Sequence, residues 1–356
     1  MPVDVFSTAP QSANFEPDRY VGRLTQVAQW SEEAGCRGML IYTDNSLIDP
    51  WLAAQIVIQS TKHLCPLVAV QPVYMHPYSV AKMTASLAYL HSRRIYFNMV
   101  AGGFRTDLLA LCDETSHDDR YERLREYTTI IKSLLSDTKP FSFAGKFYKV
   151  KGLVMKPHLP SRQLFPGIFV SGSSEAGMAA AKDLGATAVE YPKPGEEYGQ
   201  GAPRENSGIR IGIIADEQAE KAWKTAYQRF PVDRKGQIKH LVAMKVSDSQ
   251  WHKQLGEIER ELAGEPSIYW LWPFKNYSTF CPYLVGSYEE VSDELAKYMC
   301  AGFMNYILDI PAEEWDLRSA GIVFRMAAMK AKSQPKCSAG LESLSVADNS
   351  IRSVEP

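Results

Sequence analysis

Residues 169–191, FVSGSSEAGMAAAKDLGATAVEY, contain a turn of small polar residues directly before a helical pattern. An apolar run ends in Ser171-Gly172-Ser173-Ser174, and an alanine-rich amphipathic segment follows at once. The first amides of a helix have no partner within the helix and carry the positive end of its dipole. Small residues let a phosphate approach those amides, and serine hydroxyls add donors. The turn therefore predicts a phosphate site or, in the simpler interpretation, a serine that caps the helix and binds no ligand.

A second candidate segment is NMVAGGFRTDLL, residues 98–109. Asn98 closes an apolar run, and Ala101-Gly102-Gly103 leaves the backbone bare, so that a flat ring system has room to lie against it. The alternative is a turn that needs glycine for a positive φ.

The third segment is HDDRYERLREY, residues 117–127. His117 and Tyr121 are four residues apart, so on a helix they share one face. Arg120 and Tyr121 would reach a phosphate or the edge of a ring. The alternative is a charged helix start held by ion pairs.

Other kinds of reactive site find no support in the sequence. It contains no HxH, HExxH or CxxC spacing, no GxSxG elbow, no Walker motif and no GxGxxG. Metal sites, hydrolase triads and classical nucleotide sites are therefore not expected. His76, in VYMHPYS, follows an apolar run and is a candidate general acid or base, because an imidazole titrates near neutrality. The alternative for His76 is an ordinary turn residue.

The elements that would position these residues alternate along the whole chain. Short, nearly continuous apolar runs are each followed by an amphipathic segment, as in parallel strands buried on both faces. Eight such runs predict an α/β fold of the (β/α)8 TIM-barrel type, in which chemistry lies at the carboxyl ends of the strands. An open, doubly wound sheet is the alternative. The predicted strands are 3–8, 38–43, 66–73, 95–102, 167–173, 187–192, 209–216 and 304–310.

Three segments depart from this alternation within a predicted single domain, residues 1–332, and a tail follows that domain. Residues 137–166 predict a hairpin inserted after the fourth strand. Residues 193–208 lack helical periodicity, so the sixth helix is expected to be missing or very short. Residues 231–287 form an aromatic-rich insertion after the seventh strand and are a candidate lid. Residues 333–356 are rich in serine and are expected to form a disordered tail.

Composition narrows the class of protein further. The 356 residues carry a formal net charge of -2, which gives no reason to expect nucleic acid or an anionic membrane as a partner. No apolar run approaches the roughly 18 residues of a membrane helix. The start MPVDVFSTAPQ lacks the features of a signal peptide, so a cytoplasmic protein is expected. The six cysteines are scattered, which predicts free thiols.

Four motifs in order resemble the bacterial luciferase-like flavin monooxygenases: FNMVAGG, HDDRYER, FAGKFYKVKG and FVSGSSEAG. The resemblance covers residues 3–330 and is closest to the alkanesulfonate, nitrilotriacetate and dibenzothiophene-sulfone branches. It implies a barrel that binds reduced FMN from a separate NAD(P)H-dependent flavin reductase. O2 would then form a flavin hydroperoxide, which oxygenates a small organic or carrier-bound substrate. The resemblance also implies a homodimer or higher homo-oligomer.

The resemblance also assigns roles to residues. Ser173 and Ser174 fall where the family holds the FMN phosphate, within the turn that Ser171 and Gly172 begin. Tyr121 and His117, with Arg120 beside them, fall at positions that contact phosphate and flavin. The positions that match the surroundings of the isoalloxazine ring are Asp44, Asn98, Ala101 and Gly102.

Four positions depart from the family pattern. Ala101 stands in place of a threonine, and Leu47 in place of a cysteine of the alkanesulfonate branch. Gly212 replaces a histidine on the seventh strand, and Ile310 replaces a tyrosine after the eighth. An alkanesulfonate substrate is therefore not expected.

Arg210 matches an arginine of that branch. It is the candidate to hold an anionic substrate group or to stabilise a developing peroxide anion. Two alternatives to a monooxygenase remain. One is a hydride-transfer enzyme that uses a deazaflavin, and the other is a non-enzymatic flavin-binding relative. The full set of eight strands argues against the second.

Overall fold

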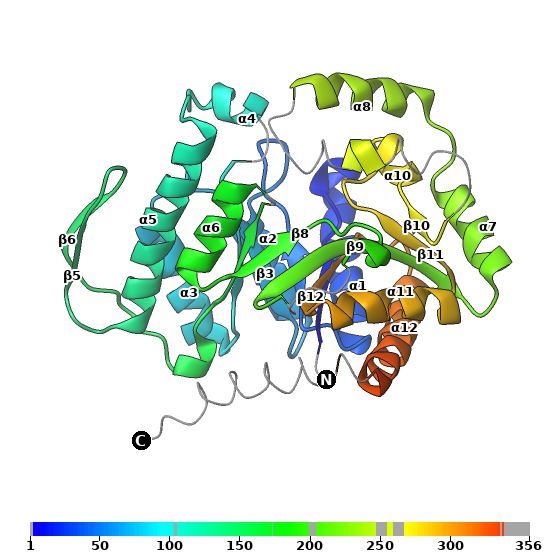
Figure 1. The fold of residues 1–356 in the computed structure, drawn as a ribbon. Helices are drawn as coiled ribbons and strands as arrows, with labels where there is room; N and C mark the ends of the chain where they lie inside the picture. The colour runs from blue at the N-terminus through cyan, green and yellow to red at the C-terminus, as the bar shows by residue number, and fades with distance from the viewer. Residues whose placement is uncertain are drawn as a thin grey trace. The chain divides into compact units, whose positions relative to one another are not determined.

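The computed structural model describes residues 3–102, 105–172, 174–198, 204–246, 255–258, 267–334 and 337. The chain forms two compact units (Figure 1). The first unit holds Met1–Val5, Glu190–Val246 and His252–Pro356, and the second holds Phe6–Val189 and Ser247–Trp251. Ser173 and Gly103, which belong to the predicted flavin site, lie outside the described residues.

The second unit is built on parallel strands that are joined by helices. The strands pair in the order β1, β2, β3, β4, β7, β8. Their bounds are β1 (Asp4–Thr8), β2 (Gly38–Ile41), β3 (Cys65–Val70), β4 (Tyr96–Val100), β7 (Gly167–Ser171) and β8 (Thr187–Glu190). The helices are α1 (Pro17–Glu33), α2 (Pro50–Ser60), α3 (Pro77–His91), α4 (Arg105–Ala110), α5 (His117–Ser136) and α6 (Glu175–Leu184). The predicted hairpin is present as β5 (Phe141–Ala144) and β6 (Lys149–Leu153).

The core of the second unit explains why its apolar runs become strands. Phe6 on β1 packs edge-on against Tyr96 on β4 and Phe169 on β7, with ring centroids 5.2 Å apart in both pairs. Helix residues cover the other face of the sheet, so the strands are buried on both sides. Short turns then leave polar residues at the carboxyl ends.

The first unit is organised around the long strand β9 (Ser207–Asp216). β12 (Phe303–Leu308) pairs in parallel with the first half of β9, and β11 (Tyr283–Ser287) pairs in parallel with the second half. β10 (Tyr269–Trp270) lies antiparallel to β11. The helices are α7 (Ala219–Arg229), α8 (Arg234–Val246), α10 (Trp272–Lys275), α11 (Tyr288–Cys300) and α12 (Glu314–Ser333).

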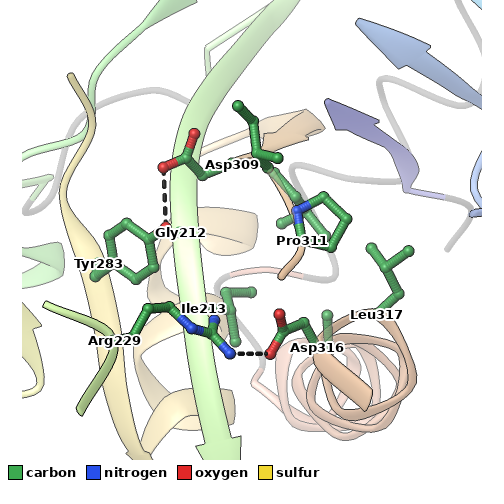
Figure 2. Close-up of a pocket in the computed structure, with 11 residues that line it drawn as sticks. Gly212, Ile213, Arg229, Tyr283, Asp309, Pro311, Asp316 and Leu317 are labelled. Carbon is green, nitrogen blue, oxygen red and sulfur yellow. Dashed lines mark hydrogen bonds and ion pairs between the residues drawn. The ribbon is translucent and has the colours of Figure 1, made fainter. Parts of the chain in front are cut away.

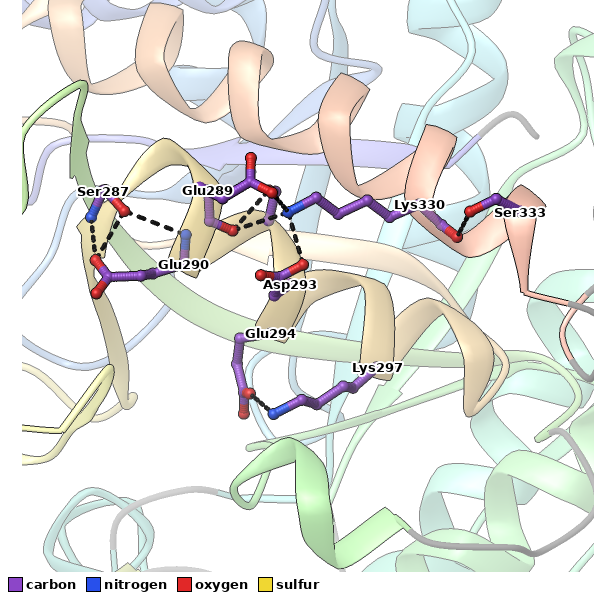
Figure 3. Close-up of polar contacts among 9 residues, drawn as sticks. Ser287, Glu289, Glu290, Asp293, Glu294, Lys297, Lys330 and Ser333 are labelled. Atoms are coloured by element: carbon purple, nitrogen blue, oxygen red, sulfur yellow. Dashed lines mark hydrogen bonds and ion pairs between the residues drawn. The ribbon is translucent and has the colours of Figure 1, made fainter.

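Two helices of the first unit are joined by ion pairs (Figure 3). Lys330 on α12 places Nζ 2.6 Å from Asp293 Oδ1 and 2.8 Å from Glu289 Oε1, both on α11. α11 begins with a capping box in which Ser287 and Glu290 satisfy each other's backbone N–H groups. These contacts fix the start of α11 and its packing against α12.

The structure confirms the eight predicted strands and the hairpin. Where a sixth helix would stand, the described residues 193–198 and 204–208 contain one short 3-10 turn, η3 (Gly195–Tyr198). The predicted lid, residues 231–287, contains β11, which is paired with β9. Its residues 247–254 and 259–266 lie outside the described part, as does the predicted tail except residues 333, 334 and 337.

The prediction of six free thiols is wrong for one pair. Cys300, at the end of α11, and Cys337, after α12, form a disulfide with Cα atoms 5.0 Å apart. The helix packing brings them together, and their separation of 37 residues hid this from the sequence. The thiols of Cys36, Cys65, Cys112 and Cys281 are not part of a disulfide.

Among the helices of the described ranges, none combines the length and apolar content of a membrane span. Nor do the described residues include three His, Cys, Asp or Glu side chains grouped to hold a metal ion.

Candidate active site

The small-residue turn lies between β7 and α6 in the second unit. Ser174 is the N-cap of α6, and its Oγ accepts a hydrogen bond from the Gly177 N–H at 3.1 Å. Ser171 Oγ donates to Asn98 Oδ1 at 2.7 Å, which joins the ends of β7 and β4. The predicted strand end and the predicted turn are therefore one local structure. Ser174 does act as a helix cap, as the simpler interpretation held.

Tyr121 on α5 closes over this turn. A Cβ on Gly172 would lie 2.3 Å from the Tyr121 hydroxyl oxygen, and Gly172 has a φ of +155°. A side chain at position 172 would therefore expel the tyrosine. Burial raises the pKa of Tyr121, while a hydrogen bond to Ser174 and the charge of Arg120 oppose that rise. The phenol stays protonated at neutral pH and can donate.

The first turn of α5 supplies the remaining polar groups. Arg120 is buried, and its Nη1 donates to the Thr115 carbonyl at 3.1 Å. Its side chain also lies next to Gly102, which follows β4. His117 packs edge-on against Tyr121 at 5.2 Å, and its Nδ1 lies 2.9 Å from Asp118 Oδ1. The predicted residues of segments 98–109, 117–127 and 169–191 thus meet in one cluster.

An ion pair that the sequence reasoning missed supports this cluster. Arg123 donates to both carboxylate oxygens of Asp113, at 2.6 and 3.2 Å, and Thr115 Oγ1 donates to Asp113 Oδ1 at 2.5 Å. Burial raises the pKa of Asp113, but these hydrogen bonds outweigh it and lower the pKa to about 2. The pair fixes the loop that leads into α5. The only signal in the sequence is an Asp-x-Thr turn before a helix with an arginine at its second turn.

A cavity of about 310 Å³ opens at the carboxyl ends of β2 and β3. Asp44 lines it and accepts hydrogen bonds from the Ser46 N–H and Oγ, both at 2.7 Å. Tyr74 also lines it and donates to Asn45 Oδ1 at 2.9 Å. Burial, followed by the charges of Asp107 and Asp44, raises the pKa of Tyr74 to about 12. The other lining residues include Thr43, Leu47, Ile48, Trp51, Gln71 and Met75.

His76 serves as the N-cap of α3. Its Nδ1 accepts a hydrogen bond from the Tyr78 N–H at 3.2 Å, and its ring packs edge-on against Tyr148 at 5.9 Å. These contacts suit the turn residue of the simpler interpretation. An acid or base role stays a prediction.

Arg210 lies on β9 in the first unit, where it has an acidic partner. Its Nη2 is 3.3 Å from Asp309 Oδ1, and its Nη1 is 3.4 Å from Tyr191 Oη. Asp309 also accepts hydrogen bonds from Thr279 Oγ1 at 2.5 Å and from Tyr283 Oη at 2.9 Å. The charge of Arg210 is therefore compensated within the protein by Asp309, and a role toward an anionic group stays a prediction.

Gly212 gives Tyr283 the room to make this contact. A Cβ at position 212 would lie 2.3 Å from Cζ of the Tyr283 ring. Figure 2 shows the ring beside Gly212, with its hydroxyl toward Asp309. Gly212, which replaces the family histidine, thus contacts Tyr283. Tyr283 in turn donates a hydrogen bond to Asp309, the partner of Arg210. Ile310, another of the four departures, lines the small pocket of the figure.

Alternating parallel strands and helices, with polar side chains at strand ends, define a (β/α)8-barrel enzyme. Residues 1–305 match the model of the luciferase-like monooxygenase family, and the chain belongs to that family. It is a flavin-dependent monooxygenase by class, as the resemblance of its motifs implied.

Particular relatives are similar to the chain over most of its length. It is 34% identical over 305 residues to 4-(gamma-L-glutamylamino)butanoyl-[BtrI acyl-carrier protein] monooxygenase BtrO of Niallia circulans, covering 83% of this chain and 89% of BtrO. Riboflavin lyase RcaE, solved with modified FMN and riboflavin, superposes with a TM-score of 0.72 at 16% identity. The match covers 93% of this chain and 92% of RcaE. Long-chain alkane monooxygenase LadA superposes with a TM-score of 0.68 at 17% identity. The match covers 93% of this chain and 92% of LadA. The structural likenesses confirm the predicted barrel fold.

Proposed function

We propose that this chain is the oxygenase of a two-component system that oxygenates an acyl group held on a carrier protein, using reduced FMN and O2. A separate NAD(P)H-dependent flavin reductase would supply the reduced FMN. The observation that carries the proposal is the buried cluster of Arg120, Tyr121 and Ser174 around the bare turn at Gly172. The relation to BtrO, which acts on a carrier-bound acyl group, supports the substrate class.

The donors of this cluster fit a phosphate. Arg120 brings a fixed positive charge, Tyr121 a protonated phenol, and Ser174 a hydroxyl at the start of the ten-residue helix α6. Each favours an oxyanion, and the helix dipole adds to them. Gly172 leaves room for the Tyr121 hydroxyl to reach this turn. These residues would hold the phosphate of FMN.

The end of β4 and the nearby cavity fit the ring and the substrate. Asn98 is held in place by Ser171, and Ala101 is small and buried, which leaves a flat surface. When bound, reduced FMN supplies the electrons that activate O2. Leu47, Trp51 and Tyr74 would keep water from that chemistry, because a dry cavity limits wasteful side reactions. A volume of about 310 Å³ is in the range of small-ligand sites.

The proposal includes a homodimer in the cytoplasm. Leu52 on α2 and Tyr89 and Leu90 on α3 are exposed large apolar side chains, between 64% and 67% exposed. Such residues favour burial against a second copy.

The test is an anaerobic titration of the purified protein with photoreduced FMN, followed by mixing with oxygenated buffer. We expect saturable binding, and binding at least about tenfold weaker in Tyr121→Phe, since a charge-assisted hydrogen bond contributes roughly 1.5–3 kcal/mol. Binding of a deazaflavin in place of reduced FMN would contradict the proposal. So would binding of neither.

A further inference from the structure

Helix α8 (Arg234–Val246) has one face anchored to the first unit. Gln237 Nε2 donates to Asn276 Oδ1 at 2.9 Å, and the His240 ring packs edge-on against Phe274 with centroids 4.6 Å apart. Figure 1 shows α8 beside α10. The helix is thus held by its inner face, and its orientation on the unit is fixed.

The opposite face of α8 carries three exposed apolar side chains. Ile238, Leu241 and Val242 are 63%, 62% and 59% exposed. Their spacing of three and four residues places them together on one side of the helix. An amphipathic helix normally turns such a stripe inward, because burial of these side chains is favourable. An exposed apolar stripe rimmed by charge is the mark of a docking surface.

The charged side chains of α8 itself are all basic, while the exposed Asp233 directly precedes the helix. Arg234, Lys235 and Lys239 are exposed beside the stripe, and residues 234–246 contain no acidic side chain. The whole chain is slightly acidic, with a formal net charge of -2, so the basic helix is a local feature. Positive rims of this kind attract acidic partners and orient them before contact.

The helix stands at the functional end of its unit. Asn276, which accepts the hydrogen bond from Gln237, lies three residues before Thr279. The Thr279 hydroxyl donates to Asp309, the residue directly after β12. α8 is therefore connected, through two polar contacts and a short turn, to the carboxyl end of β12. Active sites of (β/α)8 barrels lie at that end.

We propose that the outer face of α8 docks the carrier protein that presents the substrate. The partner would be an acidic domain with exposed apolar side chains. Acidic groups would meet Arg234, Lys235 and Lys239, and apolar ones would cover Ile238, Leu241 and Val242. Its tethered acyl group would then enter beside the carboxyl end of β12. This inference rests on the proposed function, because only a carrier-bound substrate requires such a surface.

The test is a binding titration of the full chain with fluorescently labelled BtrI acyl-carrier protein as the probe. We expect saturable binding that weakens as salt is raised. Lys235→Glu with Lys239→Glu should weaken it at least about tenfold, and Leu241→Ser should weaken it at all salt concentrations. The matched control is Lys149→Glu with Lys151→Glu, two exposed charges on the hairpin strand β6, which should leave binding unchanged.

Absence of binding, or an equal loss in the hairpin control, would overturn the docking surface. A change of oligomeric state in Leu241→Ser, measured by sedimentation, would show that this face of α8 contacts a second copy of the chain. That result would also overturn the proposed carrier-docking surface. Reduced-FMN binding by the same variants is measured separately. If the unmodified chain did not bind reduced FMN, the proposed function would be contradicted. The carrier titration would still test the docking surface independently.

Discussion

Gly172 and Tyr121 are in such close contact that a single Cβ on the glycine would lie 2.3 Å from the tyrosine hydroxyl oxygen. The glycine directly follows β7, and the tyrosine lies near the start of α5. Their contact brings together two segments that are about fifty positions apart in sequence. The proposed phosphate site exists because of this contact.

We therefore expect Gly172→Ala to lower the free energy of unfolding by about 1–3 kcal/mol, as overpacking does. It should also weaken reduced-FMN binding at least about tenfold, which is a change of about 1.4 kcal/mol. Denaturant unfolding and anaerobic titration measure the two effects. Tyr121→Phe in the same chain should restore part of the stability, because the clashing oxygen is gone.

Gly22→Ala provides the matched control for Gly172→Ala. Nothing lies within 4 Å of a Cβ built at Gly22, which is on α1. This change should raise stability by about 0.5–1 kcal/mol and leave flavin binding unaltered. An equal loss of flavin affinity in both variants would speak against a specific contact.

The pair of Asp113 and Arg123 predicts a stability change in acid. The folded pKa of Asp113, about 2, lies below its usual value of 3.8, so its contribution to stability is complete above about pH 4. That contribution, about 2 kcal/mol, is lost as the pH falls from about 4 to about 2. Unfolding measured across this range should show the loss in the wild type and lack it in Asp113→Asn/Arg123→Leu.

Removal of one partner alone should cost more than removal of both. The side chains of Arg123 and Asp113 are only 12% and 8% exposed. Arg123→Leu leaves a buried carboxylate without its cation, at a cost of about 3–5 kcal/mol. If the single and double variants were equally stable, the ion pair would not hold the loop.

Arg210 offers a test of substrate binding against structural support. Since Asp309 compensates its charge, we expect Arg210→Leu to destabilise the fold by about 3–5 kcal/mol and Asp309→Asn to recover part of that loss. Arg204, which pairs with Glu190 and is 41% exposed, provides the control; Arg204→Leu should cost no more than about 1 kcal/mol. A raised KM with unchanged stability in Arg210→Leu would instead show that Arg210 binds the substrate.

Gly212 and Tyr283 predict that the family histidine cannot simply be restored. Gly212→Ala already places a Cβ 2.3 Å from the Tyr283 ring and should cost about 1–3 kcal/mol. In the background of Tyr283→Ala, the same change should cost much less. Tyr283→Phe, which keeps the ring and loses only the hydrogen bond to Asp309, separates packing from hydrogen bonding. Additive costs of the two alanine changes would contradict the contact.

The sequence predicted the strands well because each is a continuous apolar run that ends in a polar turn. The resemblance to the family implied that Asn98, Tyr121 and Ser174 belong to one site, because all three fall within its ordered motifs. The sequence could not reveal the contact between Arg210 and Asp309, which are 99 residues apart. Nor could it reveal that β11 would pair with β9, because YLVGS lies in an aromatic-rich segment without regular alternation.

The disulfide and the caps show the same limit. The bond between Cys300 and Cys337 depends on how α11 and α12 pack, which no local pattern records. For His76 and Ser174 the local pattern supported two interpretations, and the contacts show helix capping in both. For Ser174 the cap does not exclude a ligand, because the neighbouring Arg120 and Tyr121 converge on the same turn.

The most direct test of the central claim is a single turnover with labelled oxygen. The protein would be loaded anaerobically with reduced FMN and the BtrI-bound acyl substrate of BtrO, and then mixed with ¹⁸O2. The account predicts that one ¹⁸O atom enters the acyl group for each flavin oxidised, measured by mass spectrometry of the intact carrier. An unlabelled acyl group, with all the oxygen recovered as hydrogen peroxide, would contradict it.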